Sequence, residues 1–61
     1  MIRHYSEWRL KSVMQNSRRV YAIYRLINVK KGPVPGNVIF WDFYEDLREA
    51  SRAVNELNSY I

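Results

Sequence analysis

Two segments near the middle of the chain are nearly continuous in apolar character and rich in β-branched and aromatic side chains. They are VYAIYRLINV at 20–29 and VIFWDFY at 38–44, and the segment between them, KKGPVPGN at 30–37, holds every glycine and proline of the chain. Apolar runs of this length bounded by Gly and Pro are typical of strands joined by a turn. The pattern therefore predicts an antiparallel β-hairpin over residues 20–44.

After the hairpin, apolar residues return at the spacing of a helix. This apolar stripe consists of Leu47, Ala50, Ala53, Val54, Leu57 and Ile61. Asp46 is a suitable N-cap because its carboxylate can accept a hydrogen bond from the first turn, and Glu49 suits the positive end of the helix dipole. These roles explain the carboxylates around the helix start without a metal site or a catalytic pair. We expect an amphipathic helix over residues 46–58.

The N-terminal segment, residues 1–19, fits two patterns. Ser6 as an N-cap followed by Leu10 and Val13 on one side favours a helix. The alternation of Trp8 and Leu10 with basic residues favours a strand followed by a turn into the hairpin. We prefer the helix because most residues of this segment have good helix propensity.

The chain is thus expected to be one small α+β domain. The preferred arrangement is a two-stranded antiparallel hairpin with the C-terminal helix packed on one face, together with an N-terminal helix. The alternative is a three-stranded antiparallel sheet plus one C-terminal helix. A chain of this length buries only about 60% of the surface that its unfolded state exposes, so a partner subunit would add stability.

The position of the hairpin loop sets an expected register. Symmetric closure around residues 30–37 places Arg25 opposite Asp42, which pairs the only two charges of the predicted strands. Alternation then gives an uncharged face, expected beneath the helix, that carries Ala22, Tyr24, Leu26, Ile39, Trp41 and Phe43. The other face has an apolar row without an obvious cover, and we expect it to mediate self-association: Ile23, Ile27, Val29, Val38, Phe40 and Tyr44. If the N-terminal helix covers this face instead, the chain is expected to be a monomer.

Charged residues are unevenly distributed along the chain. Residues 1–31 hold eight Lys or Arg and one Glu, a net charge of +7, whereas residues 32–61 hold two Arg and five acidic residues, a net charge of −3. A basic half suits an acidic protein partner or nucleic acid. The candidate contact residues are Arg9, Lys11, Arg18, Arg19, Arg25, Lys30 and Lys31.

Several chemistries lack the residues they need. The chain has no cysteine and a single histidine, His4, which excludes disulfides, thiolate sites and histidine metal clusters. Its glycines lie in the hairpin loop, where they form no phosphate-binding motif. We therefore expect no enzymatic activity, no catalytic, cofactor-binding or metal-binding residues, and no small-molecule substrate. Without an apolar run of about 20 residues or a signal-peptide pattern, the chain is expected to be cytoplasmic and to make no membrane contact.

The strand-to-helix step WDFYEDLREASRAVNEL, residues 41–57, is similar to the corresponding junction of the arm-type DNA-binding domains of tyrosine recombinases and of plant GCC-box-binding domains. The resemblance implies three strands packed on one helix. Those domains have glycine where this chain has Asp42, and we assign the chain to neither family. Its small size, basic charge and lack of cysteine also resemble accessory proteins of bacteriophages and prophages.

Two functions are compatible with these patterns. The preferred hypothesis is a small non-enzymatic interaction module that self-associates, as a homodimer, and binds another macromolecule. The alternative is a nucleic-acid-binding protein that uses the basic N-terminal half and the hairpin tip. The hairpin aromatics are able to stack on bases, but a core in so short a chain also requires large aromatic side chains.

Overall fold

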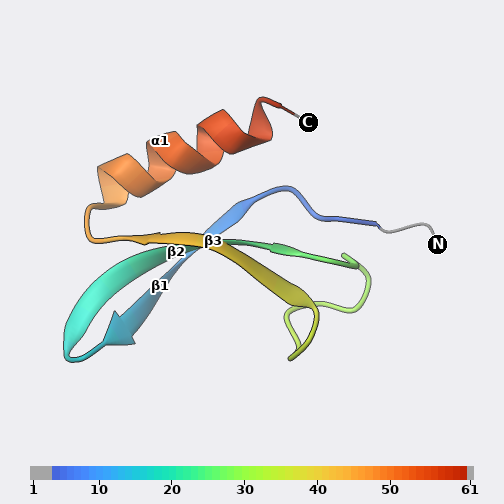
Figure 1. Ribbon diagram of the computed structural model, residues 1–61, viewed down its shortest axis with the longest axis horizontal. Helices are drawn as coiled ribbons and strands as arrows, with labels where there is room; N and C mark the ends of the chain where they lie inside the picture. Colours follow the sequence, from blue (N-terminus) through green and yellow to red (C-terminus); the bar gives the residue numbers. More distant parts are fainter. Residues whose placement is uncertain (1–3, 61) are drawn as a thin grey trace.

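The computed structural model describes residues 4–60 as a three-stranded antiparallel sheet followed by one helix (Figure 1). The elements are β1 (Arg9–Gln15), β2 (Arg18–Leu26), β3 (Val38–Tyr44) and α1 (Leu47–Asn58), with β2 in the middle of the sheet. The hairpin and the C-terminal helix are confirmed. The predicted N-terminal helix is wrong, and the alternative of three antiparallel strands plus one helix is confirmed. Ile61, the last member of the predicted apolar stripe, lies outside the described residues.

β1 is a strand despite its helix-forming composition because all seven of its residues pair with β2. A two-residue turn between Gln15 and Arg18 joins the two strands, and its residues Asn16 and Ser17 have φ angles of 50° and 65°. Two consecutive left-handed residues are the mark of a type I′ turn, whose twist matches that of an antiparallel hairpin. Strand pairing therefore overrides the local helix propensity.

α1 begins where the sequence predicts. Asp46 is the N-cap, and its carboxylate accepts a hydrogen bond of 2.8 Å from the backbone N–H of Arg48. The helix then runs back along the sheet (Figure 1), and the side chain of its last residue, Asn58, contacts the segment before β1. The side-chain amide of Asn58 donates to Trp8 O at 3.0 Å, and its oxygen accepts from Trp8 N–H at 2.7 Å. These two hydrogen bonds anchor the end of α1 to the N-terminal segment.

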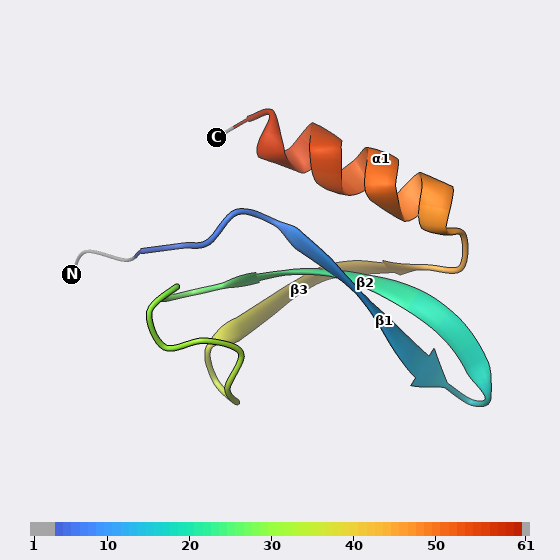
Figure 2. The same ribbon diagram turned by 180° about the vertical axis from the view of Figure 1, so that it is seen from behind.

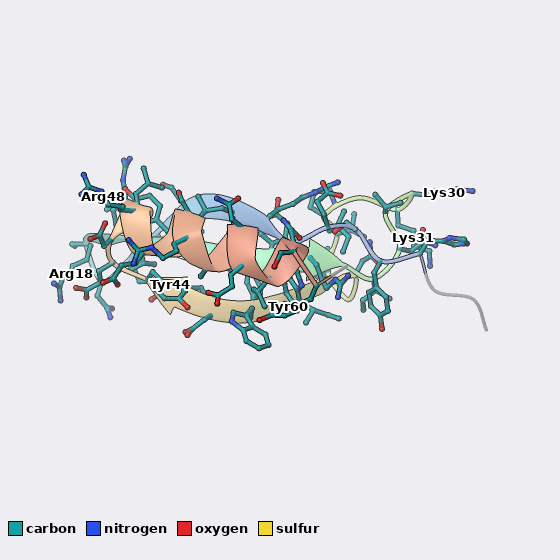
Figure 3. The ribbon with its side chains drawn as sticks, turned by 90° about the horizontal axis from the view of Figure 1, so that it is seen from above. Arg18, Lys30, Lys31, Tyr44, Arg48 and Tyr60 are labelled. Carbon is teal, nitrogen blue, oxygen red and sulfur yellow. The ribbon has the colours of Figure 1, made fainter. Side chains whose placement is uncertain are left out.

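The helix covers one face of the sheet and leaves the other open. The strand register and the alternation of side chains assign each strand residue to one of the two faces. The centre of the helix-covered face is Ile23, which is fully buried, and Leu10 and Tyr44 on the outer strands are half-buried. Tyr44 lies beside α1 when the molecule is seen from the helix side (Figure 3). The open face carries Arg9, Lys11, Val13, Gln15, Arg18, Val20, Ala22, Tyr24, Leu26, Val38, Phe40 and Phe43.

Both ends of the sheet bend away from the helix (Figures 1 and 2). The β1–β2 turn lies at one end, and the loop between β2 and β3 lies at the other. Leu26 at the loop end of β2 is 1% exposed although it faces away from α1. The open face is therefore concave along the strand direction.

The register between β2 and β3 differs from the predicted one. Leu26 lies opposite Val38, and Arg25 lies opposite Ile39, so the predicted pairing of Arg25 with Asp42 is wrong. The strands separate earlier than expected because the backbone of residues 27–29 hydrogen-bonds to loop residues and to the N-terminal segment.

The predicted uncharged face beneath the helix is also wrong. The shifted register divides its six members between the two sides of the sheet. Ile39 lies on the helix-covered side, and Trp41, the bulge residue, contacts Trp8, which lies against Arg25 on that side. The other four lie on the open face: Ala22, Tyr24, Leu26 and Phe43.

A β-bulge at Trp41 changes the direction in which β3 presents its side chains. Phe40 pairs with Tyr24 and Asp42 pairs with Ile23, so one extra residue of β3 fits between two adjacent residues of β2. An insertion of one residue reverses the face of every residue that follows it. As a result, Phe40 and the residue three positions after it, Phe43, share the open face, where simple alternation would separate them.

The segment before β1 extends the sheet by hydrogen bonding to the last residue of β2 and to the residues after it. The N–H of Ser6 donates to Leu26 O at 3.0 Å, and the N–H of Val29 donates to His4 O at 2.9 Å. The Ser6 hydroxyl accepts from Leu26 N–H at 2.8 Å and donates to Glu7 O at 2.8 Å. Since Ser6 is only 3% exposed, its hydroxyl satisfies a backbone N–H that water does not reach.

Replacing Ser6 with Ala is expected to lower the free energy of unfolding by about 1–3 kcal/mol, because the buried Leu26 N–H loses its acceptor. Urea denaturation followed by far-UV circular dichroism measures this change. Ser12, which is exposed in β1, is the matched control, and Ser12→Ala should change the free energy of unfolding by less than about 0.5 kcal/mol. Equal effects of the two substitutions would contradict the role given to Ser6.

Replacing Ser17 with Gly is expected to raise the free energy of unfolding by about 0.5–1 kcal/mol, since the left-handed conformation is strained for a residue with a Cβ and glycine adopts it freely. Thermal denaturation measures the change as a higher melting temperature. Ser12→Gly serves as the control and should lower the melting temperature, because glycine weakens a strand. A lower melting temperature for Ser17→Gly would argue against the type I′ turn.

Candidate functional site

Three aromatic rings form a cluster on the open face. Phe40 and Phe43 stack with their ring centroids 5.6 Å apart and their planes inclined by 24°, and Tyr24 lies against Phe40 with a centroid distance of 6.4 Å. Phe40 is 48% exposed and Phe43 is 43% exposed. The bulge at Trp41 produces this cluster because it turns Phe43 to the same side as Phe40. The open face therefore presents an aromatic surface to solvent.

Lys11 places a positive charge over this aromatic cluster. Its Nζ lies 5.2 Å from the ring centroid of Tyr24 and 5.3 Å from that of Phe40, within the range of a cation–π interaction. Because Lys11 is in β1 and Phe40 is in β3, the contact spans the width of the sheet. Among residues 4–60, Lys11 has no carboxylate partner. Its charge is therefore free to meet an anionic ligand.

The open face carries three cations and no carboxylate. Arg9 and Arg18 share the face with Lys11, and each lies close to a carboxylate outside the strands. The Nε of Arg9 is 3.1 Å from Glu7 Oε1, and the Nη2 of Arg18 is 3.5 Å from Glu45 Oε2. Exposed ion pairs of this kind contribute little to stability, so both arginines can exchange these partners for an anionic ligand.

The ionisation of Glu7 affects how available the charge of Arg9 is to an anionic ligand. The pKa of Glu7 is lowered below its ordinary value, first by a backbone hydrogen bond at Glu7 itself and then by the hydrogen bond and the charge of Arg9. Glu7 is therefore ionised at neutral pH and holds Arg9 close to it. Of the three open-face cations, Lys11 is the one whose charge is not offset by a nearby carboxylate among the described residues.

Most of the acidic residues that follow β2 lie away from the open face, and the exception is Glu45, which contacts Arg18 at the end of that face. Asp42 belongs to the helix-covered side, and the other four are in the β3–α1 turn and in α1: Glu45, Asp46, Glu49 and Glu56. The carboxylates of the second half of the sequence thus lie mainly on the helix side of the molecule. An anionic partner meets attraction on the open face and carboxylates on the helix side.

Arg25, a predicted contact residue, is occupied within the protein. Its Nε and Nη2 donate to Ser6 O at 3.2 Å and 3.0 Å, and its guanidinium carbon lies 4.6 Å from the ring centroid of Tyr5 and 4.7 Å from that of Trp8. Trp8 also contacts Trp41 edge to face, with the centroids 5.7 Å apart. Arg25 therefore holds the N-terminal segment against the sheet.

The other predicted contact residues lie toward the two ends of the sheet. Lys30 and Lys31 are exposed in the loop between β2 and β3, at the opposite end of the molecule from Arg18 (Figure 3). Arg19 is exposed next to the β1–β2 turn, but the register places it on the helix-covered side. The basic residues are thus distributed along the 38 Å length of the molecule, and Lys11 lies between its ends.

Asn37 gives the loop between β2 and β3 a defined shape. Its Nδ2 donates to Asn28 O at 2.9 Å and to Gly32 O at 2.8 Å, and its Oδ1 accepts from Asn28 N–H at 2.9 Å. Gly32 and Gly36 have φ angles of 75° and 85°, which glycine adopts without strain. The two lysines of the loop are therefore held on an ordered base.

The structure divides the predicted self-association row among three places. Ile23 is fully buried and Tyr44 is half-buried, both on the helix-covered face. The other four are divided between the loop and the open face: Ile27 and Val29 in the loop, Val38 and Phe40 on the open face. The row therefore does not form one continuous surface.

Sequence reasoning assigned Tyr24 and Phe43 to the core beneath the helix, and their place on the open face is a correction. No local signal could identify the bulge, because Trp41 is one of four aromatic residues within the five-residue run FWDFY. A bulge is defined by how two strands pair, which composition does not reveal.

Replacing Asn37 with Asp is expected to lower the free energy of unfolding by at least about 1–3 kcal/mol, because two donated hydrogen bonds are lost and a carboxylate faces two carbonyl oxygens in a buried position. Chemical denaturation at neutral pH measures the loss. Asn55 is exposed in α1, so Asn55→Asp changes the charge equally without removing this network. If the two variants lost the same stability, Asn37 would not be the residue that organises the loop.

The comparisons with known proteins supply no relative from which a function could be carried over. No family model, no curated protein and no solved structure matches the chain significantly. Within residues 4–60, no helix is long and apolar enough to cross a membrane, and no three His, Cys, Asp or Glu side chains are placed to hold a metal ion. A proposal about function must therefore rest on the open face and its own chemistry.

Proposed function

We propose that this protein is a non-enzymatic nucleic-acid-binding protein that uses the open face of its sheet. The observation that carries the proposal is Lys11, whose ammonium group lies over the rings of Tyr24 and Phe40 without a carboxylate partner among the described residues. Cations interleaved with exposed aromatic rings match the two components of nucleic acid, its phosphates and its bases.

Electrostatics favour this ligand over a second copy of the chain. The exposed rings of Phe40 and Phe43 are also the specific observation in favour of self-association, since exposed aromatics are common in interfaces. A two-fold dimer, however, places the same surface on both sides of its interface. It would bring the cations of one open face against those of the other, including both copies of Lys11. The negative phosphates of a nucleic acid are instead attracted by these cations.

The proposal predicts binding that weakens steeply with salt. If the three cations of the open face each contact a phosphate, affinity should fall about 20- to 40-fold between 50 and 200 mM salt. Fluorescence anisotropy with labelled DNA and RNA oligonucleotides measures the affinity. Light scattering on the same samples shows whether the free protein is a monomer or a dimer.

A pair of charge variants locates the surface. Lys11→Gln is expected to reduce the slope of log affinity against log salt by about 0.7 to 0.9 in magnitude, which corresponds to one lost phosphate contact. Arg52→Gln removes the same charge from an exposed position on α1, on the other side of the sheet, and should leave the slope nearly unchanged. Absence of binding at 50 mM salt, or equal effects of the two variants, would reject the proposal.

A further inference from the structure

We infer that the nucleic acid bound by the open face is single-stranded and that one of its bases stacks on the rings of Phe40 and Phe43. This inference rests on the nucleic-acid binding proposed above and specifies the ligand of the same site. Its basis is the combination of a stacked, half-exposed aromatic pair with a concave, cationic sheet face.

The aromatic pair is suited to the face of a base. The two rings are inclined by only 24° to each other, and both are close to half exposed, so together they extend one aromatic surface. A phenyl ring has no hydrogen-bond donor or acceptor with which to read the edge of a base pair in a groove. In a duplex the faces of the bases are covered by their neighbours, whereas an unpaired base can turn its face to a ring.

The middle of β2 on the open face also lacks the groups that read a duplex. Bidentate contacts to bases in the major groove come from Arg, Lys, Asn and Gln side chains that reach the groove floor. The middle of β2 contributes instead Val20 and Ala22, which are apolar and buried. Gln15 and Arg18 are at the end of the face, beside the β1–β2 turn. A duplex would therefore gain phosphate contacts but little base readout.

Lys11 connects the stacking site to the phosphates. Its ammonium group is on a flexible four-carbon chain, and it now lies over the rings of Tyr24 and Phe40. A base that stacks on Phe40 takes this place, and the ammonium group then moves to the phosphate beside that base.

Basic residues at the two ends of the molecule define a path for the bound nucleic-acid strand. Arg18 lies at one end of the long axis, and Lys30 and Lys31 lie at the other (Figure 3). The 38 Å length corresponds to about 11 nucleotides at the 3.4 Å rise of a stacked strand, and to fewer if the strand is extended.

The experiment compares single strands with the matching duplex. Labelled single-stranded DNA and RNA of about 4, 8, 12 and 16 nucleotides are titrated with the intact protein at 50 mM salt, which covers the site sizes known for such proteins. The single strands are expected to bind at least about tenfold tighter than a duplex of equal length, and affinity should level off near about 8–12 nucleotides, because longer strands extend beyond the path. Trp8 and Trp41 are on the other side of the sheet, so their fluorescence should change little.

Ring variants test the stacking site itself. Phe40→Leu and Phe43→Leu remove a ring from an exposed position and should each weaken single-strand binding by about 5- to 150-fold, the value for one stacked base, without changing the salt slope. Phe40→Tyr keeps the ring and should bind like the unaltered protein. Tyr60→Leu, at an 81% exposed position beyond α1, is the matched control and should have no effect. Circular dichroism establishes that each variant is folded before it is titrated.

The outcomes separate this inference from the proposed function. A duplex that binds as tightly as the single strand, or leucine variants that bind the single strand unchanged, would overturn the single-strand inference. If Lys11→Gln still reduced the salt slope in those experiments, nucleic-acid binding by the open face would stand. Failure of every oligonucleotide to bind at 50 mM salt would overturn the proposed function and the inference together.

Discussion

One extra residue in β3 decides which of its side chains lie on each face of the sheet. Trp41 is the extra residue, between Phe40, which pairs with Tyr24, and Asp42, which pairs with Ile23. The side chains of β3 therefore exchange faces at this point. Phe43 therefore joins Phe40 on the open face, and Asp42 turns to the helix side. With regular pairing, Asp42 would share a face with Phe40 and would bring a carboxylate into the aromatic cluster. Exposed rings and a face free of acidic residues, on which the proposed function rests, are both consequences of this bulge.

The small core makes polar anchors important. Within residues 4–60 the only large side chains that are fully buried are Ile23 and Leu26. Each irregular part of the fold depends on a side chain that satisfies backbone groups. Ser6 does this where the N-terminal segment meets β2, Asn37 in the loop between β2 and β3, and Asn58 at the end of α1. Through these contacts, segments with little apolar contact of their own are held in the fold.

Arg25 illustrates why the candidate site could be predicted only in part. Arg25 and Asp42 are the only charges of the predicted strands, and a symmetric loop would place them opposite each other. The fold places the guanidinium of Arg25 against Ser6 O and between the rings of Tyr5 and Trp8. These partners lie 17 or more positions away along the chain, so no local pattern shows that they will meet. The sequence identifies Lys11 by its charge alone, because its position over two rings depends on the pairing of all three strands.

The sequence by itself determined the hairpin, its glycine- and proline-rich loop, the C-terminal helix with its Asp46 N-cap, and the separation of basic and acidic halves. These features depend on propensity, periodicity and composition, which act between residues close together in the chain. Only the tertiary structure decided that β1 is a strand, which face the helix covers, and where β3 bulges. The physical reason is that strand pairing has a period of two, so a shift of one residue exchanges the two faces without changing any local preference. The observed register, with its bulge in β3, brings Phe40, Phe43 and Lys11 together on one exposed surface.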